Sequence, residues 1–201
     1  MILYYVHDPM CSWCWAFRPV WQALQSMLPS AISVTSILGG LAADSQTPMS
    51  LAMRRDIQQH WRVIQKRVPR TKFNFDFWDV CEPKRSTYPA CRAVIAAKYQ
   101  GAAFEDAMIL AIQQAYYLYA QNPSDDDVLM ACASKLGLDI KMFEHDFYSQ
   151  KCEAQLMDDV RLSRDIGAEG FPSLILFQDE KYQSIRLDYN QPEPMLAQII
   201  R

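Results

Sequence analysis

The spacing of apolar residues changes twice within the first forty residues of the chain. Residues 2–6, ILYYV, form an unbroken β-branched and aromatic run, which predicts a buried strand. From residue 11 to about residue 28, apolar side chains recur at steps of three and four, which predicts a helix that Pro19 should kink. A second strand is predicted over residues 31–40. Strand, helix and strand with short connections predict a parallel βαβ unit.

The following hundred residues have helical periodicity throughout most of their length. The predicted helices cover residues 48–67, 88–100, 102–120, 124–137 and 139–149. Ser124 is the expected N-cap of the fourth of these helices. Residues 71–87 have no clear period, so a loop or a broken turn is expected there.

The last fifty residues return to a mixed pattern. A helix is predicted over residues 151–167, followed by strands over 171–178 and 182–189 that a tight turn should pair antiparallel. A helix over residues 191–201 closes the chain. The whole pattern predicts a βαβ unit, an all-helical insertion, and then a helix, two strands and a helix.

Composition narrows the classes of function. The 201 residues are 50% hydrophobic and 21% charged, which is the balance of a folded protein with a sizeable core. The net charge is −3 and no basic run is present, so neither a nucleic-acid nor a membrane surface is expected. Residues 1–8 lack the features of a signal peptide, and we expect a cytoplasmic protein whose cysteines are mostly reduced.

Candidate chemistry centres on Cys11 and Cys14, a C-x-x-C pair that directly follows the first predicted strand. The start of a helix presents unpaired N–H groups and the positive end of the helix dipole, which stabilise a thiolate. Cys11 should lie exposed at this position, with Cys14 one turn later and partly buried beneath it. Cys11 is therefore the expected nucleophile, and Cys14 the thiol that resolves a mixed disulfide.

A zinc site is the competing interpretation of such a pair. Tetrahedral zinc needs four ligands, commonly a second cysteine pair or closely spaced histidines. The three histidines, His7, His60 and His145, have no such spacing, so no metal is expected. The remaining cysteines are interpreted as isolated thiols rather than a second redox pair: Cys81, Cys91, Cys132 and Cys152.

In combination, these motifs resemble the thioredoxin fold. The likeness rests on the strand, the C-x-x-C at a helix start, Pro19 five residues after Cys14, and GFPSL at residues 170–174 before a strand pair. A long helical insertion after the first βαβ unit resembles the DsbA-like branch of that family. HDPMCSWCW and LGGL at residues 38–41 look typical of its cytoplasmic, FrnE-like members.

The resemblance implies an α/β, thioredoxin-like fold with an inserted all-helical domain. Residues 1–44 and 152–201 would form the thioredoxin-like domain, and residues 45–151 the insertion. The implied activity is that of a protein disulfide oxidoreductase that acts on protein or peptide thiols and disulfides. No bound cofactor is implied, and the resemblance leaves open whether glutathione is a co-substrate. Substrate, direction of electron flow and oligomeric state are not readable from the chain.

The resemblance also assigns roles around the cysteines. Pro172 would be cis and lie against the redox pair, and the backbone of Phe171 would be exposed for a substrate peptide to pair with. Ser12 and Trp13, between the two cysteines, are expected to tune the thiolate and contact substrate. These six residues form the predicted site.

Two points are left open by the resemblance. The kappa-class glutathione transferases and hydroxychromene-carboxylate isomerases are similar in architecture but place serine where Cys11 stands, so a glutathione-dependent transferase or isomerase is the alternative function. The buried acid of thioredoxins falls on Tyr5 here. Deprotonation of Cys14 by Asp8, by water or with no dedicated base therefore stays open.

Further expectations concern the surroundings of the site. Trp15, Phe17 and Trp21 should belong to the core. His7 should be an exposed loop residue, and the alternative is a cation that stabilises the Cys11 thiolate. Some of the aromatic residues in 73–78 should line a groove that faces Cys11, because that segment has no helical period to hide its rings. Most of the insertion's aromatic residues should be core: Trp61, Phe73, Phe75, Phe77, Trp78, Tyr116, Tyr117 and Tyr119.

Overall fold

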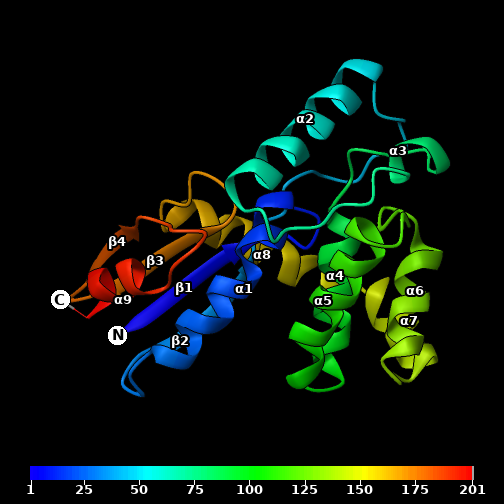
Figure 1. The fold of residues 1–201 in the computed structure, drawn as a ribbon. Coiled ribbons are helices and arrows are strands. Elements are labelled where there is room, and N and C mark those ends of the chain that lie inside the picture. The colour runs from blue at the N-terminus through cyan, green and yellow to red at the C-terminus, as the bar shows by residue number, and fades with distance from the viewer. Residues whose placement is uncertain (201) are drawn as a thin grey trace.

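The computed structural model describes residues 1–200, and a single four-stranded sheet lies at one end of the molecule (Figure 1). The strand order is β2-β1-β3-β4, with β1 and β2 parallel and the other neighbours antiparallel. The strands span Ile2–His7 for β1, Ser33–Leu38 for β2, Ser173–Gln178 for β3 and Lys181–Ile185 for β4. The predicted βαβ unit and the antiparallel strand pair are both confirmed.

The register of the sheet brings the two ends of the chain together. In the β1–β3 pair, Val6 lies opposite Ser173 and Tyr5 opposite Leu174. Because β1 and β3 run antiparallel, the segment that follows β1 meets the segment that precedes β3. Cys11 is thereby placed beside Phe171 and Pro172, which are 160 residues away along the chain.

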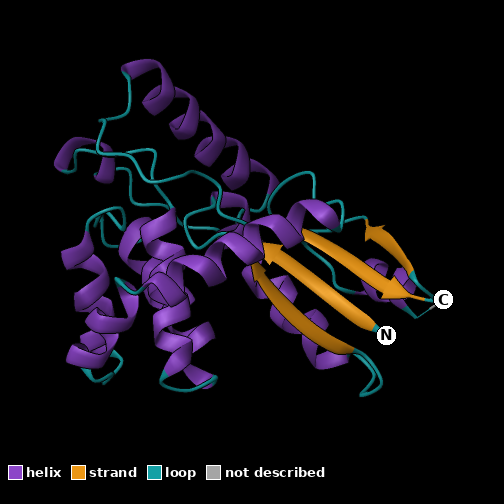
Figure 2. Ribbon diagram, turned by 180° about the vertical axis from the view of Figure 1, so that it is seen from behind, coloured by secondary structure: helices purple, strands orange, loops and turns teal. Residues whose placement is uncertain are grey.

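Helices cover both faces of the sheet (Figure 2). Helices α1 (Ser12–Met27) and α9 (Glu193–Ile199) pack on one face, with Leu3, Leu174 and Leu176 beneath them. Helix α8 (Gln150–Asp165) crosses the other face, where Val6, Ile37 and Ile175 are buried. The alternation of side chains along a strand explains why neighbours such as Leu174 and Ile175 enter different clusters.

The predicted helical insertion is present between β2 and α8. Its five longer helices match the predicted segments and differ mainly at their ends, where helix boundaries are least determined by periodicity. They are α2 (Leu51–Arg67), α4 (Tyr88–Tyr99), α5 (Ala103–Tyr117), α6 (Asp126–Lys135) and α7 (Ile140–Phe147). Helix α4 is the central one, because residues on nearly all of its sides are buried.

Three local predictions are wrong. The expected loop or broken turn over 71–87 is irregular for most of its length but includes a short helix that was not predicted, α3 (Phe77–Val80), whose two aromatic rings enter the core. The N-cap of α6 is Asp125, because the Ser124 hydroxyl instead donates to the carbonyl of Ser86 at 2.7 Å. Strand β4 ends at Ile185, and the residues up to Tyr189 leave the sheet.

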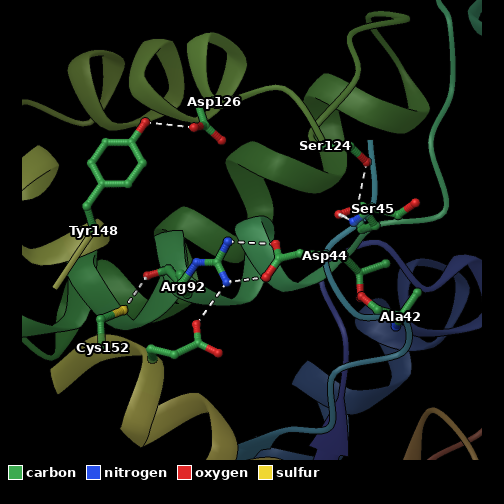
Figure 3. A network of polar contacts seen from close by, with 11 residues as sticks. Ala42, Asp44, Ser45, Arg92, Ser124, Asp126, Tyr148 and Cys152 are labelled. Carbon is green, nitrogen blue, oxygen red and sulfur yellow. Dashed lines mark hydrogen bonds and ion pairs between the residues drawn. The ribbon is translucent and has the colours of Figure 1, made fainter. Parts of the chain in front are cut away.

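A partly buried arginine joins three segments on the insertion side of the sheet (Figure 3). Arg92 of α4 forms two hydrogen bonds with Asp44, at 2.7 and 2.8 Å, and one with Glu153 of α8 at 2.9 Å. The carbonyl of Arg92 accepts a hydrogen bond from the Cys152 thiol at 3.4 Å. Figure 3 shows the guanidinium between the loop after β2 and helix α8, so Arg92 fixes the position of α4 relative to both.

The largest buried cluster crosses from the insertion to the sheet. It contains most of α4 and α5 together with Met10, Leu38 and Val160, which belong to the sheet side. The hydroxyl of Tyr117 donates to the carbonyl of Met10 at 2.6 Å. The division into residues 1–44 with 152–201 and residues 45–151 stays a prediction. None of the helices described within residues 1–200 has the length and apolar character needed to span a bilayer.

Candidate active site

Cys11 stands at the junction between β1 and α1. It is the N-cap residue of α1, with φ −79° and ψ 119°. Its N–H donates to the Asp8 carbonyl at 3.1 Å, and its own carbonyl accepts the N–H of Trp15 at 3.0 Å. A tight turn followed at once by a helix therefore holds the thiol at the helix start, as the spacing predicts.

The two sulfurs of the motif differ in accessibility. Cys11 is 6% exposed and Cys14 is fully buried, so both are more enclosed than expected. The Cys11 thiol donates to the Phe171 carbonyl at 3.4 Å, and that contact accounts for part of its enclosure. The pKa of Cys14 is raised, first by burial and then by its hydrogen bond to Cys11 and the charge of that sulfur. All six cysteines are free thiols.

The predicted cis bond is present between Phe171 and Pro172. Pro172 is buried directly before β3, and Phe171 lies partly exposed beside Cys11. Gly39, at the end of β2, allows this arrangement: a Cβ on Gly39 would lie 1.9 Å from Cε1 of Phe171. Glycine is required at this position because the Phe171 ring lies too close to leave room for any side chain.

A groove of about 350 Å³ lies over Cys11. Four of the six predicted site residues line it together, namely Cys11, Ser12, Trp13 and Phe171. Cys14 and Pro172 lie outside its lining. The insertion supplies the opposite wall: Ile57, His60, Trp61, Arg85 and Tyr116. The prediction that residues 73–78 line this groove is wrong, because Phe77 and Trp78 are buried and Phe75 and Trp78 line a different depression.

Sequence reasoning missed the wall that the insertion supplies. Ile57, His60 and Trp61 follow at three- and four-residue steps on α2, so they share one face of that helix. This periodicity was a usable signal for a common face. It carries no information about what that face meets, because the groove also needs Arg85 and Tyr116 from other segments.

Trp13 is held from two sides. Its ring meets that of Tyr189 edge-on, with centroids 5.0 Å apart. The guanidinium of Arg67, at the end of α2, lies 5.6 Å from the Trp13 ring and 5.5 Å from the Tyr189 ring. The motif is thus braced by the insertion and by the C-terminal segment, through edge-to-face and cation–π contacts.

Asp8 is a fully buried carboxyl beneath the motif. It accepts hydrogen bonds from the N–H groups of Met10 at 2.8 Å and Leu41 at 2.7 Å, from the Thr87 hydroxyl at 2.6 Å, and from the Cys91 thiol at 3.6 Å. Burial raises its pKa, and the donors oppose that effect. These hydrogen bonds connect the turn before Cys11 to the start of α4.

Two further side chains of β1 differ from expectation. His7 is 1% exposed and its Nε2 bonds the Ser36 hydroxyl at 2.8 Å, so the expected exposed loop histidine is wrong. Burial, followed by the charge of Arg18, lowers the pKa of His7 to about 3. Burial and the two cysteines raise the pKa of Tyr5 well above 10. Tyr5 is therefore a neutral phenol and does not replace the missing acid as a base.

The core predictions near the motif are largely confirmed. Phe17 and Trp21 are buried, and Trp15 is half-buried with its Nε1 donating to the Lys72 carbonyl at 3.0 Å. Of the insertion's aromatic residues, Tyr119 is 62% exposed. The other thiols have separate surroundings: Cys81 donates to Ala120, Cys91 to Asp8, and Cys152 to Arg92.

Comparison with known proteins agrees with this geometry. The profile of the family described as Thioredoxin matches residues 4–196. The ClpXP adapter protein SpxH of Halalkalibacterium halodurans is 26% identical over 203 residues, which covers 98% of this chain and 66% of that protein. The chain thus spans slightly less than two thirds of that relative's length.

A solved structure is similar over its whole length. The cytosolic disulfide reductase DsbM from Pseudomonas aeruginosa has 25% identity and a TM-score of 0.79, with 100% of this chain and 97% of that chain covered. A second structure of DsbM, with GSH, has a TM-score of 0.78 at 25% identity, and covers 100% and 98% of the two chains. The profile, the sheet order, the helical insertion and the motif at the start of α1 together place this chain in the thioredoxin family, with the DsbA-like form of the fold.

Proposed function

We propose that this protein is a thiol–disulfide oxidoreductase in which Cys11 attacks and Cys14 resolves. The observation that carries the proposal is the arrangement of the two sulfurs. Cys11 lines an open groove beside the Phe171 carbonyl, whereas Cys14 is fully buried behind it. A substrate sulfur can therefore reach only the first cysteine, which separates the two roles.

The reaction proceeds by two exchanges. The Cys11 thiolate attacks one sulfur of a substrate disulfide, which forms a mixed disulfide and releases the other sulfur as a thiolate. Cys14, once deprotonated, attacks the Cys11 sulfur, which forms the Cys11–Cys14 disulfide and releases the second substrate thiolate. The substrate gains two electrons and the pair loses two, and the reverse steps oxidise a dithiol.

The raised pKa of Cys14 controls the second step. A buried thiol must lose its proton before it can attack, and the substrate thiolate released in the first step is an available acceptor. Asp8 acts as a positioning residue in this scheme, because its hydrogen bonds go to the turn before Cys11, to Leu41 and to α4.

Peptides and small thiols are the proposed substrates. Phe171 is partly exposed beside Cys11, and its backbone is the proposed edge for an extended peptide. Trp13 and Ile57, which are also partly exposed, provide apolar surface in the groove. Glutathione is a proposed co-substrate, supported by the structure of the similar DsbM with GSH.

Serine variants of the two cysteines test the proposal. Cys11→Ser should lower thiol–disulfide exchange with oxidised glutathione by roughly 100-fold or more, because the attacking thiolate is lost. Cys14→Ser should instead accumulate a mixed disulfide on Cys11, visible by intact-mass spectrometry. Exchange that survives in Cys11→Ser would refute the assigned role.

The direction of electron flow follows from the reduction potential of the Cys11–Cys14 couple. A value near −270 mV would make the protein a reductant of the thioredoxin type, and a value near −120 mV an oxidant. Equilibration with glutathione buffers of known ratio, followed by alkylation and mass analysis, gives this potential directly.

The glutathione-dependent transferase or isomerase is the alternative enzyme. Those enzymes carry serine at the position of Cys11, so Cys11→Ser would retain or gain their activity. Glutathione-dependent turnover of an aromatic substrate by this variant, with no thiol exchange by the wild type, would favour the alternative over our proposal.

A second candidate function comes from the similarity to proteins named ClpXP adapters, which extends over 98% of this chain. An adapter would bind its client without turnover of the cysteines. Adding the Cys11→Ser, Cys14→Ser double variant to purified ClpXP and a client separates the two functions. Faster client degradation with the double variant would establish an adapter activity that does not depend on the redox pair.

A further inference from the structure

A second cavity, of about 460 Å³, is lined by residues of α1, the first two strands and α5. It shares no lining residue with the groove over Cys11. Its volume lies within the range of pockets that hold small organic molecules. The redox chemistry proposed above uses none of its walls.

Two buried polar side chains face this cavity. Arg18 is 8% exposed, and its Nη2 donates a hydrogen bond to Oδ2 of Asp106 at 2.6 Å. Gln113 is 2% exposed, and its Oε1 has no hydrogen-bond partner within residues 1–200. A buried amide oxygen without a partner is unfavourable. Rotation of this terminal amide by 180° would exchange its enclosed oxygen with its nitrogen, and a bound molecule with a donor group would then satisfy the oxygen.

Flat rings form one side of the cavity. Tyr5 stacks on His7 with centroids 4.6 Å apart, and on Trp21 at 4.5 Å. All three residues line the cavity. The stacked rings of Tyr5 and Trp21 present their edges to a planar ligand, next to the guanidinium of Arg18.

The charges around the opening exclude some ligands. Lys98 pairs with Glu105 at 2.8 Å, and Arg18 pairs with Asp106, whose side chain is 72% exposed. The four charges cancel, so a polyanion such as a nucleotide triphosphate would meet two carboxylates. Arg18 is the one charge held inside, and a guanidinium binds a single carboxylate well because its N–H groups match both oxygens.

We propose that this cavity binds a small aromatic carboxylate with a hydroxyl or N–H group on its ring. The carboxylate bonds Arg18, the ring lies along Tyr5 and Trp21, and the polar ring substituent reaches the amide of Gln113. Asp106 competes with the ligand for the guanidinium. The proposal does not depend on the reaction at Cys11.

The probe for the test is 4-hydroxyphenylacetate, measured by titration calorimetry with the reduced full chain. We expect one site per chain. The neutral 4-hydroxyphenylacetamide should bind about tenfold or more weakly, the loss expected for a hydrogen bond to a charged group. Phenylacetate, which lacks the hydroxyl group, should also bind more weakly.

Variants locate the site. Arg18→Met and Gln113→Leu should each weaken binding of the probe by about tenfold or more, whereas Arg55→Met, on the exposed side of α2, should leave it unchanged. Asp106→Asn should tighten binding, because the competing carboxylate is removed. A gain in affinity cannot arise from general damage to the fold.

A third variant covers the case in which Arg18→Met does not fold. Val34→Trp places a large ring into the cavity from the partly exposed strand β2 and should abolish binding while thiol exchange at Cys11 persists. The proposal is overturned if the wild type binds none of the three probes, if Val34→Trp folds and still binds, or if Asp106→Asn weakens binding. Loss of probe binding in Cys11→Ser would also overturn the proposal, because it would show that the probe binds in the groove over Cys11 instead.

Discussion

At the scale of single residues, burial changes the chemistry of the first strand most. His7 and Asp8 are adjacent in sequence and both are buried, yet burial shifts their pKa values in opposite directions. The histidine is held neutral and the carboxyl is more easily protonated, since burial disfavours the charged form of each group. The sequence pattern shows neither effect, because two polar residues after a strand look like the start of an exposed loop.

His7 should make stability depend on pH. Its pKa is about 3 in the folded chain and about 6.5 when unfolded, so between these values only the unfolded chain binds the extra proton. Stability is therefore lost as pH falls below about 6.5. From pH 7 to pH 5 the loss attributable to His7 is about 2 kcal/mol.

Denaturant unfolding at both pH values, in the wild type and in His7→Gln, measures this contribution. The variant should lose about 2 kcal/mol less than the wild type over the same range. Asp8, with its raised pKa, acts in the opposite direction at lower pH and is present in both proteins. Equal pH dependence in the two proteins would contradict the assignment to His7.

Gly39 should be sensitive to the smallest substitution. A Cβ there would lie 1.9 Å from the Phe171 ring, so Gly39→Ala must displace that ring from its place beside Cys11. The expected cost is about 1–3 kcal/mol, as for other overpacked sites, with slower thiol exchange. Gly170→Ala is the matched control, since a Cβ there meets no atom within 4 Å. An equal loss of stability in both variants would disprove the packing argument.

At the scale of elements, one arginine joins α4 to two distant segments. Arg92 joins Asp44 and Glu153, and its guanidinium lies 5.8 Å from the Phe147 ring. Helices joined by side chains from distant segments cannot be placed from their own periodicity. Ion pairs with half-exposed partners are weaker than buried ones, but here one side chain carries three hydrogen bonds.

Arg92→Met should therefore lower the free energy of unfolding by about 1–3 kcal/mol. The control is Arg161→Met, which removes an exposed pair with Asp158 within one helix and should change stability by less than about 0.5 kcal/mol. Urea denaturation of the three proteins compares them directly. A loss in Arg161→Met as large as that in Arg92→Met would show that the network adds nothing.

At the scale of the whole molecule, the insertion and the sheet share a core. Met10 and Leu38 belong to the cluster that contains α4 and α5, and Tyr117 bonds the Met10 carbonyl. Separating the insertion would expose these side chains to water and leave a buried carbonyl without its donor. Cooperative behaviour of the two parts follows from this shared burial.

We accordingly expect one thermal transition, with calorimetric and van't Hoff enthalpies that agree. Residues 45–151 expressed alone should lack the sharp unfolding transition of the whole chain, because part of their core is missing. Two separated transitions in the whole chain would show instead that the predicted division into two domains is also a division in stability.

The sequence alone determined the order of the longer elements and the C-x-x-C motif at the start of α1, because periodicity and backbone-specific residues act locally. The place of Pro172 beside that motif was implied by the resemblance to the thioredoxin fold. It misassigned short features whose state depends on distant contacts, such as α3, the N-cap of α6 and the burial of His7. Only the tertiary structure decided which side chains meet over Cys11, because His60, Trp61, Arg85 and Tyr116 come from separate segments. It likewise created the cavity at Arg18 and Gln113, since burial and unpaired hydrogen-bonding groups exist only once distant parts of the chain have packed together.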